Sequence, residues 1–387
     1  MAATDANALR NELGTLKALL PSDPGNPALL RRCAQLAVEL GEYVEALQLS
    51  SAALTASPGD AEALFHRASA LVGLRQFNEA AECLTALRAH GVGVAGVSAN
   101  LALCYYALGD FERAAALLDT LLAAQEVSTD LLRLAVSARH HLGDIDGAVA
   151  LADAHSKAAL TSSAAAGVCA LAYLDAGRAT DAARFAESAL TRDRDCVDAL
   201  SVVGTVALSN MDSAGAQRSF DRILEIAPGN GRALIGLGTI ALLAQDMPLA
   251  RAYLERGITA MPGHVGSWHV LGWTYLISGE LDAAERTFNR ALELDRNFAE
   301  THGALAAVHA FRARPADARR EIALAERLDR EGLATFFAKA MLAGQGGNPD
   351  ATLSLIRSGI ARLIPKVSTR AAKVLSAAAR PSNRTRH

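Results

Sequence analysis

The chain has 387 residues, of which 51% are hydrophobic but only 5% aromatic, and its formal net charge at pH 7 is −3. A β-rich core would require more β-branched and aromatic side chains, so this composition favours helices packed through alanine and leucine. One long uncharged stretch, Ala158–Leu174, contains Thr161, Ser162 and Ser163 in its middle. We interpret it as a buried helix with its preceding turn, which excludes a membrane span.

Residues 1–26 open the chain without a basic region followed by an apolar run. No secretory signal is therefore visible, and we expect a cytoplasmic protein. Leucines recur at helical spacing over residues 7–21, which predicts an amphipathic N-terminal capping helix that shields the elements after it. These leucines are Leu9, Leu13, Leu16, Leu19 and Leu20.

Residues 27–332 contain an alanine that returns every 34 residues. A fixed period of this size indicates stacked structural repeats rather than the core of a globular enzyme. The region therefore predicts nine equivalent units in one register. The recurring residues are Ala46, Ala80, Ala114, Ala148, Ala182, Ala216, Ala250, Ala284 and Ala318.

Residues 265–298 are the clearest copy of the repeat. They resemble the tetratricopeptide (TPR) pattern W-x2-L-G-x2-Y…A-x3-F, whose period is about 34 residues. The resemblance implies an all-α fold, a right-handed α-solenoid (superhelix) of stacked TPR helical hairpins, over 27–332. The matching residues are Trp268, Leu271, Gly272, Tyr275, Ala284 and Phe288.

Small residues within the units agree with helical hairpins. The eighth residue of most units is alanine or glycine, as at Ala34 and Gly272, which lets the two helices of a hairpin approach closely. Gly41 and Gly279 fall between the helices of their units. Glycine suits a tight turn there because it adopts backbone angles that other residues avoid.

The C-terminal part of the sequence departs from the repeat. Residues 333–364 predict a degenerate tenth unit, and eight Lys or Arg residues but no acidic residue follow Asp350. We predict that residues 365–387 form a basic C-terminal capping helix, which a repeat array needs, and a disordered tail. The alternative is that this basic segment contacts nucleic acid or an anionic lipid surface.

The sequence contains no phosphate-binding loop, zinc-protease, dinucleotide or hydrolase-nucleophile motif. The adjacent His140 and His141 would diverge on a helix, so we expect no metal site. The five cysteines are widely spaced without a C-x-x-C motif, which indicates buried thiols in a reducing compartment. We therefore predict no catalytic residue, no cofactor and no enzymatic activity.

In proteins that resemble this one, ligands usually lie in a concave groove lined by the first helix of each unit. Trp273, unlike Trp268, does not define the repeat, so we predict an exposed aromatic anchor at Trp273 and a buried core residue at Trp268. The alternative is that a neighbouring helix or the superhelix itself buries Trp273. The predicted groove residues are Leu103, Tyr106, Arg133, Arg232, Ile235, Thr239, Leu242, His269, Trp273 and Leu276.

Within this set, Ile235, Leu242, Trp273 and Leu276 are predicted to form an apolar floor, and Arg232 a polar edge together with His269. The sequence thus favours a non-enzymatic interaction scaffold that binds a peptide segment or a partner protein in its groove. The alternative is a regulatory or assembly subunit whose catalytic partner is a separate chain.

Overall fold

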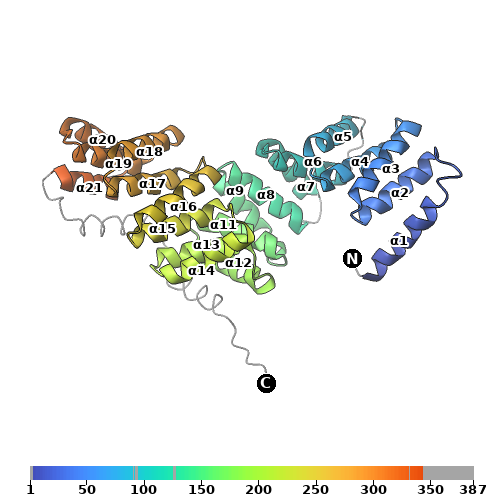
Figure 1. Cartoon of the computed structure of the whole chain (residues 1–387), viewed down its shortest axis with the longest axis horizontal. Helices are drawn as coiled ribbons and strands as arrows, with labels where there is room; N and C mark the ends of the chain where they lie inside the picture. The colour runs from blue at the N-terminus through green and yellow to red at the C-terminus, as the bar shows by residue number, and fades with distance from the viewer. Residues whose placement is uncertain (1–2, 90, 92–94, 125–127, 331, 343–387) are drawn as a thin grey trace, which may run out of the picture. The chain divides into compact units, whose positions relative to one another are not determined.

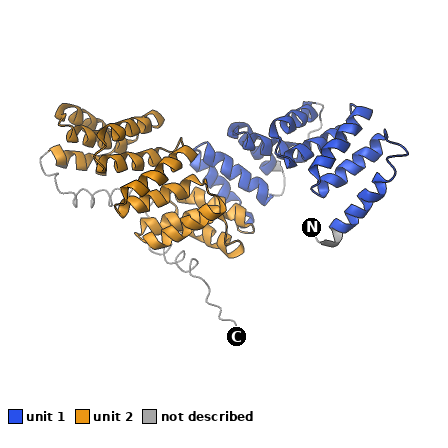
Figure 2. Cartoon of the chain, in the orientation of Figure 1, with its two compact units in different colours: residues 1–159 blue, residues 160–387 orange. Residues whose placement is uncertain are grey.

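A computed structural model describes residues 3–89, 91, 95–124, 128–330 and 332–342 of the chain (Figure 1). Every regular element in these ranges is an α-helix, which confirms the predicted all-α fold. The chain divides into two compact units, residues 1–159 and residues 160–387, and each is described by itself (Figure 2).

Unit 1 contains, in its described residues, the helix α1 followed by helical hairpins. The first helices of these hairpins begin at 34-residue intervals, and so do the second helices. The fourth hairpin is less regular, because its second helix has only 10 residues and a separate short helix follows. The helices are α1 (Ala3–Lys17), α2 (Pro27–Glu39), α3 (Tyr43–Ala56), α4 (Ala61–Gly73), α5 (Phe77–Ala89), α6 (Ala95–Ala107), α7 (Phe111–Ala124), α8 (Thr129–His141), α9 (Ile145–Ala154) and α10 (Ser156–Ala159).

Unit 2 keeps the same interval for both helices of each hairpin. Its last described helix, α21, begins 34 residues after the first helix of the preceding hairpin. The helices are α11 (Ser163–Asp175), α12 (Ala179–Arg192), α13 (Val197–Ser209), α14 (Ser213–Ile226), α15 (Gly231–Leu243), α16 (Met247–Ala260), α17 (Val265–Ile277), α18 (Leu281–Leu294), α19 (Ala299–Phe311), α20 (Pro315–Leu328) and α21 (Leu333–Leu342).

The recurring alanines lie where the two helices of each hairpin meet. All nine have no exposed surface. Opposite Ala250, a Cβ atom added at Gly238 would lie 2.6 Å from Cγ of Leu254, so no larger residue fits without a shift. The 34-residue pattern therefore records close helix packing through small side chains, as predicted.

The turn inside each hairpin contains a residue with left-handed backbone. Glycine occupies this place at five of the nine equivalent positions, including Gly41 (φ 76°) and Gly279 (φ 77°). In the other hairpins a residue with a side chain takes the same conformation: Arg75, Met211, Gln245 and Ala313. The geometry of the turn is thus constant, although the sequence signal for it is present in only part of the array.

The ends of the array are described unequally. Leu13 of α1 is buried against the first hairpin, and Lys17 forms an ion pair with Glu45 of α3. At the other end, only α21 of the predicted tenth unit is described. Residues 343–364 of that unit lie outside the described residues, as do the predicted basic cap and tail, residues 365–387.

The uncharged stretch before Leu174 forms most of α11, a helix of 13 residues with Ser162 as its N-cap. Nine residues of this helix are buried, which agrees with the interpretation as a core helix. Among the helices that the structure describes, none has the length and apolar character needed to cross a membrane.

Candidate functional site

The ten predicted groove residues all lie on first helices of hairpins, but their exposure differs. The residues on α6 and α8 in unit 1 and two residues near the start of α15 in unit 2 are half-buried. The remaining ones are buried. The half-buried residues are Leu103, Tyr106, Arg133, Arg232 and Ile235, and the buried residues are Thr239, Leu242, His269, Trp273 and Leu276.

In unit 1, Tyr106 belongs to a small aromatic cluster. Its ring lies 5.4 Å from that of Phe111 and 5.8 Å from that of His141, and the latter two rings stack at 4.4 Å. Burial, with a smaller effect of the neighbouring His140, lowers the pKa of His141. The cluster connects the end of α6, the start of α7 and the end of α8. A binding role for Leu103, Tyr106 and Arg133 stays a prediction.

The predicted exposure of Trp273 is wrong, because its side chain is only 7% exposed. The indole Nε1–H donates a hydrogen bond of 2.9 Å to Nε2 of His269. The Trp273 ring also lies 5.9 Å from the ring of Phe288 and 5.7 Å from that of Phe337, both in edge-to-face geometry. Trp273 is therefore part of the core of unit 2.

The helix α21 is what covers Trp273. Gly303 of α19 has no side chain, and a Cβ atom there would lie 2.5 Å from the backbone nitrogen of Thr335. The carboxylate of Glu300 accepts hydrogen bonds of 2.9 Å from the first backbone N–H groups of α21, at Leu333 and Ala334. These contacts place Phe337 over Trp273, as the alternative interpretation of a neighbouring covering helix proposed.

The predicted polar role of His269 is also wrong. Its side chain is 1% exposed, and burial lowers its pKa to about 3, so the ring is neutral at physiological pH. Since Nε2 accepts from Trp273, the proton lies on Nδ1, which finds no hydrogen-bond partner among the described residues. Leu242 and Leu276 are likewise buried, at 2% and 4% exposure, so the predicted apolar floor is mostly core.

The other tryptophan, Trp268, is only half-buried, which contradicts its predicted core position. Its Nε1–H donates to the backbone carbonyl of Pro262 at 2.9 Å, and the guanidinium of Arg290 lies 6.0 Å from its ring centre. The burial of the two tryptophans is therefore the reverse of the prediction.

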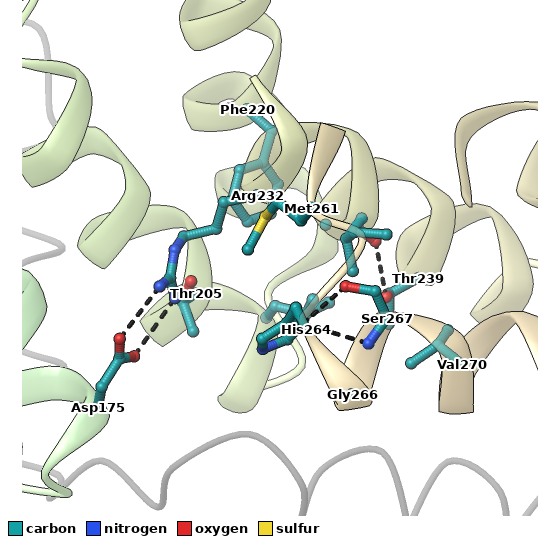
Figure 3. Close-up of a pocket in the computed structure, with 13 residues that line it drawn as sticks. Asp175, Thr205, Phe220, Arg232, Thr239, Met261, His264, Gly266, Ser267 and Val270 are labelled. Carbon is teal, nitrogen blue, oxygen red and sulfur yellow. Dashed lines mark hydrogen bonds and ion pairs between the residues drawn. The ribbon is translucent and has the colours of Figure 1, made fainter. Parts of the chain in front are cut away.

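A pocket of about 380 Å³ opens between α13, α15 and α17, the first helices of three successive hairpins (Figure 3). Three predicted groove residues line it: Arg232, Ile235 and Thr239. This volume lies in the range of sites that bind small ligands or anchor side chains. The other lining residues are Asp175, Thr205, Leu208, Phe220, Gly236, Met261, His264, Gly266, Ser267 and Val270.

One side of the pocket is an ion pair between Asp175 and Arg232, which face each other in Figure 3. Two hydrogen bonds join the guanidinium to the carboxylate, at 3.3 Å and 3.1 Å. The two side chains are 24% and 23% exposed for Arg232 and Asp175, so the pair is partly screened from water. Asp175 ends α11 and Arg232 begins α15, so the pair links hairpins that are not adjacent in sequence.

The opposite side of the pocket contains His264, the N-cap of α17. Its Nδ1 accepts the backbone N–H of Ser267 at 3.2 Å and lies 2.6 Å from the Ser267 hydroxyl. A serine beside a histidine resembles a nucleophile with its base, but Ser267 has no exposed surface and its hydroxyl cannot reach a substrate. The arrangement caps a helix, and it gives the pocket wall polar groups that are already satisfied.

Sequence reasoning missed several lining residues, and the repeat itself could have revealed one of them. Thr205 is the ninth residue of its 34-residue repeat, and Thr239 occupies the same position in the next repeat. Asp175 gives no such signal, because its role depends on a partner two hairpins away. In the described part of the chain, no cluster of three or more His, Cys, Asp or Glu residues is arranged to hold a metal ion.

Family models identify the repeats directly. Residues 65–128, 99–160, 169–230 and 204–265 match a model described as tetratricopeptide repeat, and residues 265–298 match a second model of the same description. These matches together span more than half of the chain. The chain therefore belongs to the tetratricopeptide repeat family, and its fold is an α-solenoid of TPR hairpins.

The chain is also similar to two solved structures. YrrB, described as a TPR protein with an unusual peptide-binding site, is 20% identical with a TM-score of 0.35, and the match covers 45% of this chain and 90% of YrrB. A chain of the APC/C hetero-tetramer Cut9–Hcn1 is 15% identical with a TM-score of 0.45, and the match covers 89% of this chain and 94% of that chain. No curated protein matches the sequence.

Proposed function

We propose that this protein is a non-enzymatic scaffold that binds a peptide segment of a partner protein along the first helices of unit 2. Membership in the TPR family supports a role in protein–protein interaction. The five cysteines are free and buried, which suits the reducing cytoplasm in which we expect the protein to act.

The pocket between α13, α15 and α17 is the observation that supports this site. It combines a concave shape with apolar side chains, such as Ile235 and Val270, and with a few fixed polar groups. A site of this composition holds one anchor side chain in its apolar part and orients the ligand through its polar edge. We propose the residues that line this pocket as the binding site in unit 2, without Trp273 and Leu276, which are core residues.

Filling the pocket tests the proposal. Thr205 is half-buried on the pocket wall, so Thr205→Trp should occupy the space that an anchor side chain would take. The tagged full chain is purified from its native cells, the partner is identified by mass spectrometry, and the binding segment is synthesised as a fluorescent peptide. We expect Thr205→Trp to weaken binding of that peptide at least tenfold.

The matched control is Thr259→Trp, which adds the same side chain at an exposed place on the second helix α16. This variant should bind like the wild type, and circular dichroism should show unchanged helix content in both. A partner that binds the Thr205→Trp variant as tightly as the wild type would refute the proposed site. Catalytic turnover of a substrate by the purified protein alone, abolished by a single substitution, would refute the scaffold role.

A further inference from the structure

The charges at the edge of the pocket indicate which class of ligand it can accept. Asp175 is the one partner of Arg232 among the residues that the structure describes, and the two side chains meet through two hydrogen bonds. The carboxylate therefore neutralises the cation that lines the pocket. An anionic ligand finds no unopposed positive charge at this edge.

An acidic ligand would also have to share Arg232 with Asp175. Two carboxylates on one guanidinium repel each other, and displacing Asp175 would break both of its hydrogen bonds to Arg232. A neutral carbonyl oxygen has neither difficulty. The guanidinium has five N–H donors, and the bonds to Asp175 use one on each terminal nitrogen. The remaining donors can bind the backbone of a peptide while Asp175 holds the group in place.

The interior of the pocket is suited to an apolar side chain. Leu208, Ile235, Met261 and Val270 contribute aliphatic or thioether surface. The neighbouring hydroxyl of Thr239 is already bonded to the backbone carbonyl of Ile235 at 2.8 Å, so it does not require a polar ligand. A volume of about 380 Å³ accommodates a leucine, methionine or phenylalanine side chain together with adjoining backbone.

We propose that the pocket selects an extended peptide with an uncharged apolar anchor, and that Asp175 sets this specificity by neutralising Arg232 and excluding acidic peptides. The inference rests on the proposed peptide-binding function and adds the chemical class of the ligand. Discrimination of this kind, by an element that opposes the wrong ligand, is a common basis of specificity.

The test uses a phage-displayed library of random 12-residue peptides, panned against the full-length wild type, Asp175→Asn and Thr205→Trp. The wild type should enrich peptides with a leucine, methionine or phenylalanine anchor and no excess of Asp or Glu. Asp175→Asn should enrich acidic peptides instead, because Arg232 is then unopposed. Thr205→Trp should lose the peptides that the wild type selects.

Synthetic peptides then give the magnitude. For the best wild-type peptide, replacing its anchor by aspartate should weaken binding at least tenfold in the wild type, and this ratio should fall at least tenfold in Asp175→Asn. Adding Arg232→Gln to Asp175→Asn should remove the gain for acidic peptides, which shows that the gain requires the freed cation and not a disturbed fold.

The outcomes separate the two proposals. If the wild type selects no peptide that depends on the open pocket, the proposed function fails and this inference fails with it. If pocket-dependent peptides are found but are acidic, or if Asp175→Asn leaves the anchor preference unchanged, the proposed function stands and the role of Asp175 is refuted.

Discussion

Two stretches of unit 2 contain the same repeat but differ in the space between their first helices. Between α13, α15 and α17 the first helices leave an open pocket, whereas between α17, α19 and α21 the corresponding space is filled by Trp273 and Phe337. The ninth residue of the 34-residue repeat is threonine at Thr205 and Thr239 but tryptophan at Trp273. The repeat sets where helices begin, and the residue at this place determines whether the space between them is pocket or core.

The fifth residue of the 34-residue repeat lies near the next first helix at several places in unit 2. At Gly303 the absence of a side chain lets the backbone of α21 come into direct contact, and at Gly167 the side chains of Cys196 and Asp198, at the start of α13, lie close. At the equivalent place in α15, the side chain of Ile235 lines the pocket instead. The glycine at this position thus permits the close approach of α21 to α19, whereas Ile235 in α15 lines an open pocket.

The largest expected effect separates the two tryptophans. Trp273→Ala removes a buried side chain from an aromatic cluster, so it should lower the free energy of unfolding by roughly 3–5 kcal/mol. Trp268→Ala removes a half-buried ring and should cost clearly less. Urea denaturation followed by circular dichroism measures both. Equal losses would show that the burial of Trp273 does not distinguish the closed stretch.

The second effect is a loss of folding stability in acid in the closed stretch, the part of unit 2 formed by α17, α19 and α21. The pKa of His269 is about 3 in the folded protein and about 6.5 in an unfolded chain, so unfolding takes up a proton between these values. The stabilisation that depends on a neutral His269 ring is complete above pH 6.5 and is lost as pH falls towards 3. At pH 4 the free energy of unfolding should therefore be lower by about 3 kcal/mol.

Denaturation at pH 7 and at pH 4 checks this expectation, with His269→Leu as the control that cannot titrate. The variant should lose less stability on acidification than the wild type. An NMR titration in which the His269 ring becomes protonated near pH 6 would contradict the assigned burial.

The smallest effect concerns the close approach of α19 and α21. Gly303→Ala places a methyl group against the backbone of Thr335, so we expect a loss of roughly 1–3 kcal/mol from overpacking. Because Phe337 would shift with α21, the fluorescence of Trp273 should move to longer wavelength. Gly263→Ala is the control, since its added Cβ meets no atom within 4 Å. An unshifted spectrum in Gly303→Ala would show that α21 tolerates the change.

The sequence predicted the fold well because its signal is local and repeated. Each first helix begins at the expected interval, and the buried Ala182 and Ala250 occupy the expected contacts. The site was predicted only in part. Arg232, Ile235 and Thr239 line the pocket, but the burial of Trp273 depends on α21, a helix two hairpins further along the chain. A pattern with a 34-residue period describes what every unit shares, and it says nothing about contacts that one pair of units makes alone.

The ion pair of Asp175 with Arg232 joins α11 to α15 and passes over the hairpin that begins with α13. The contact of Phe337 with Trp273 likewise joins α21 to α17 and passes over α19. The stability of a repeat array is usually treated as intrinsic terms plus coupling between nearest neighbours. In unit 2 a second-neighbour coupling must be added, so a hairpin in its middle cannot unfold without disturbing hairpins on both sides. Unit 2 should accordingly behave as one cooperative block of several repeats, longer than the single repeat that its sequence periodicity defines.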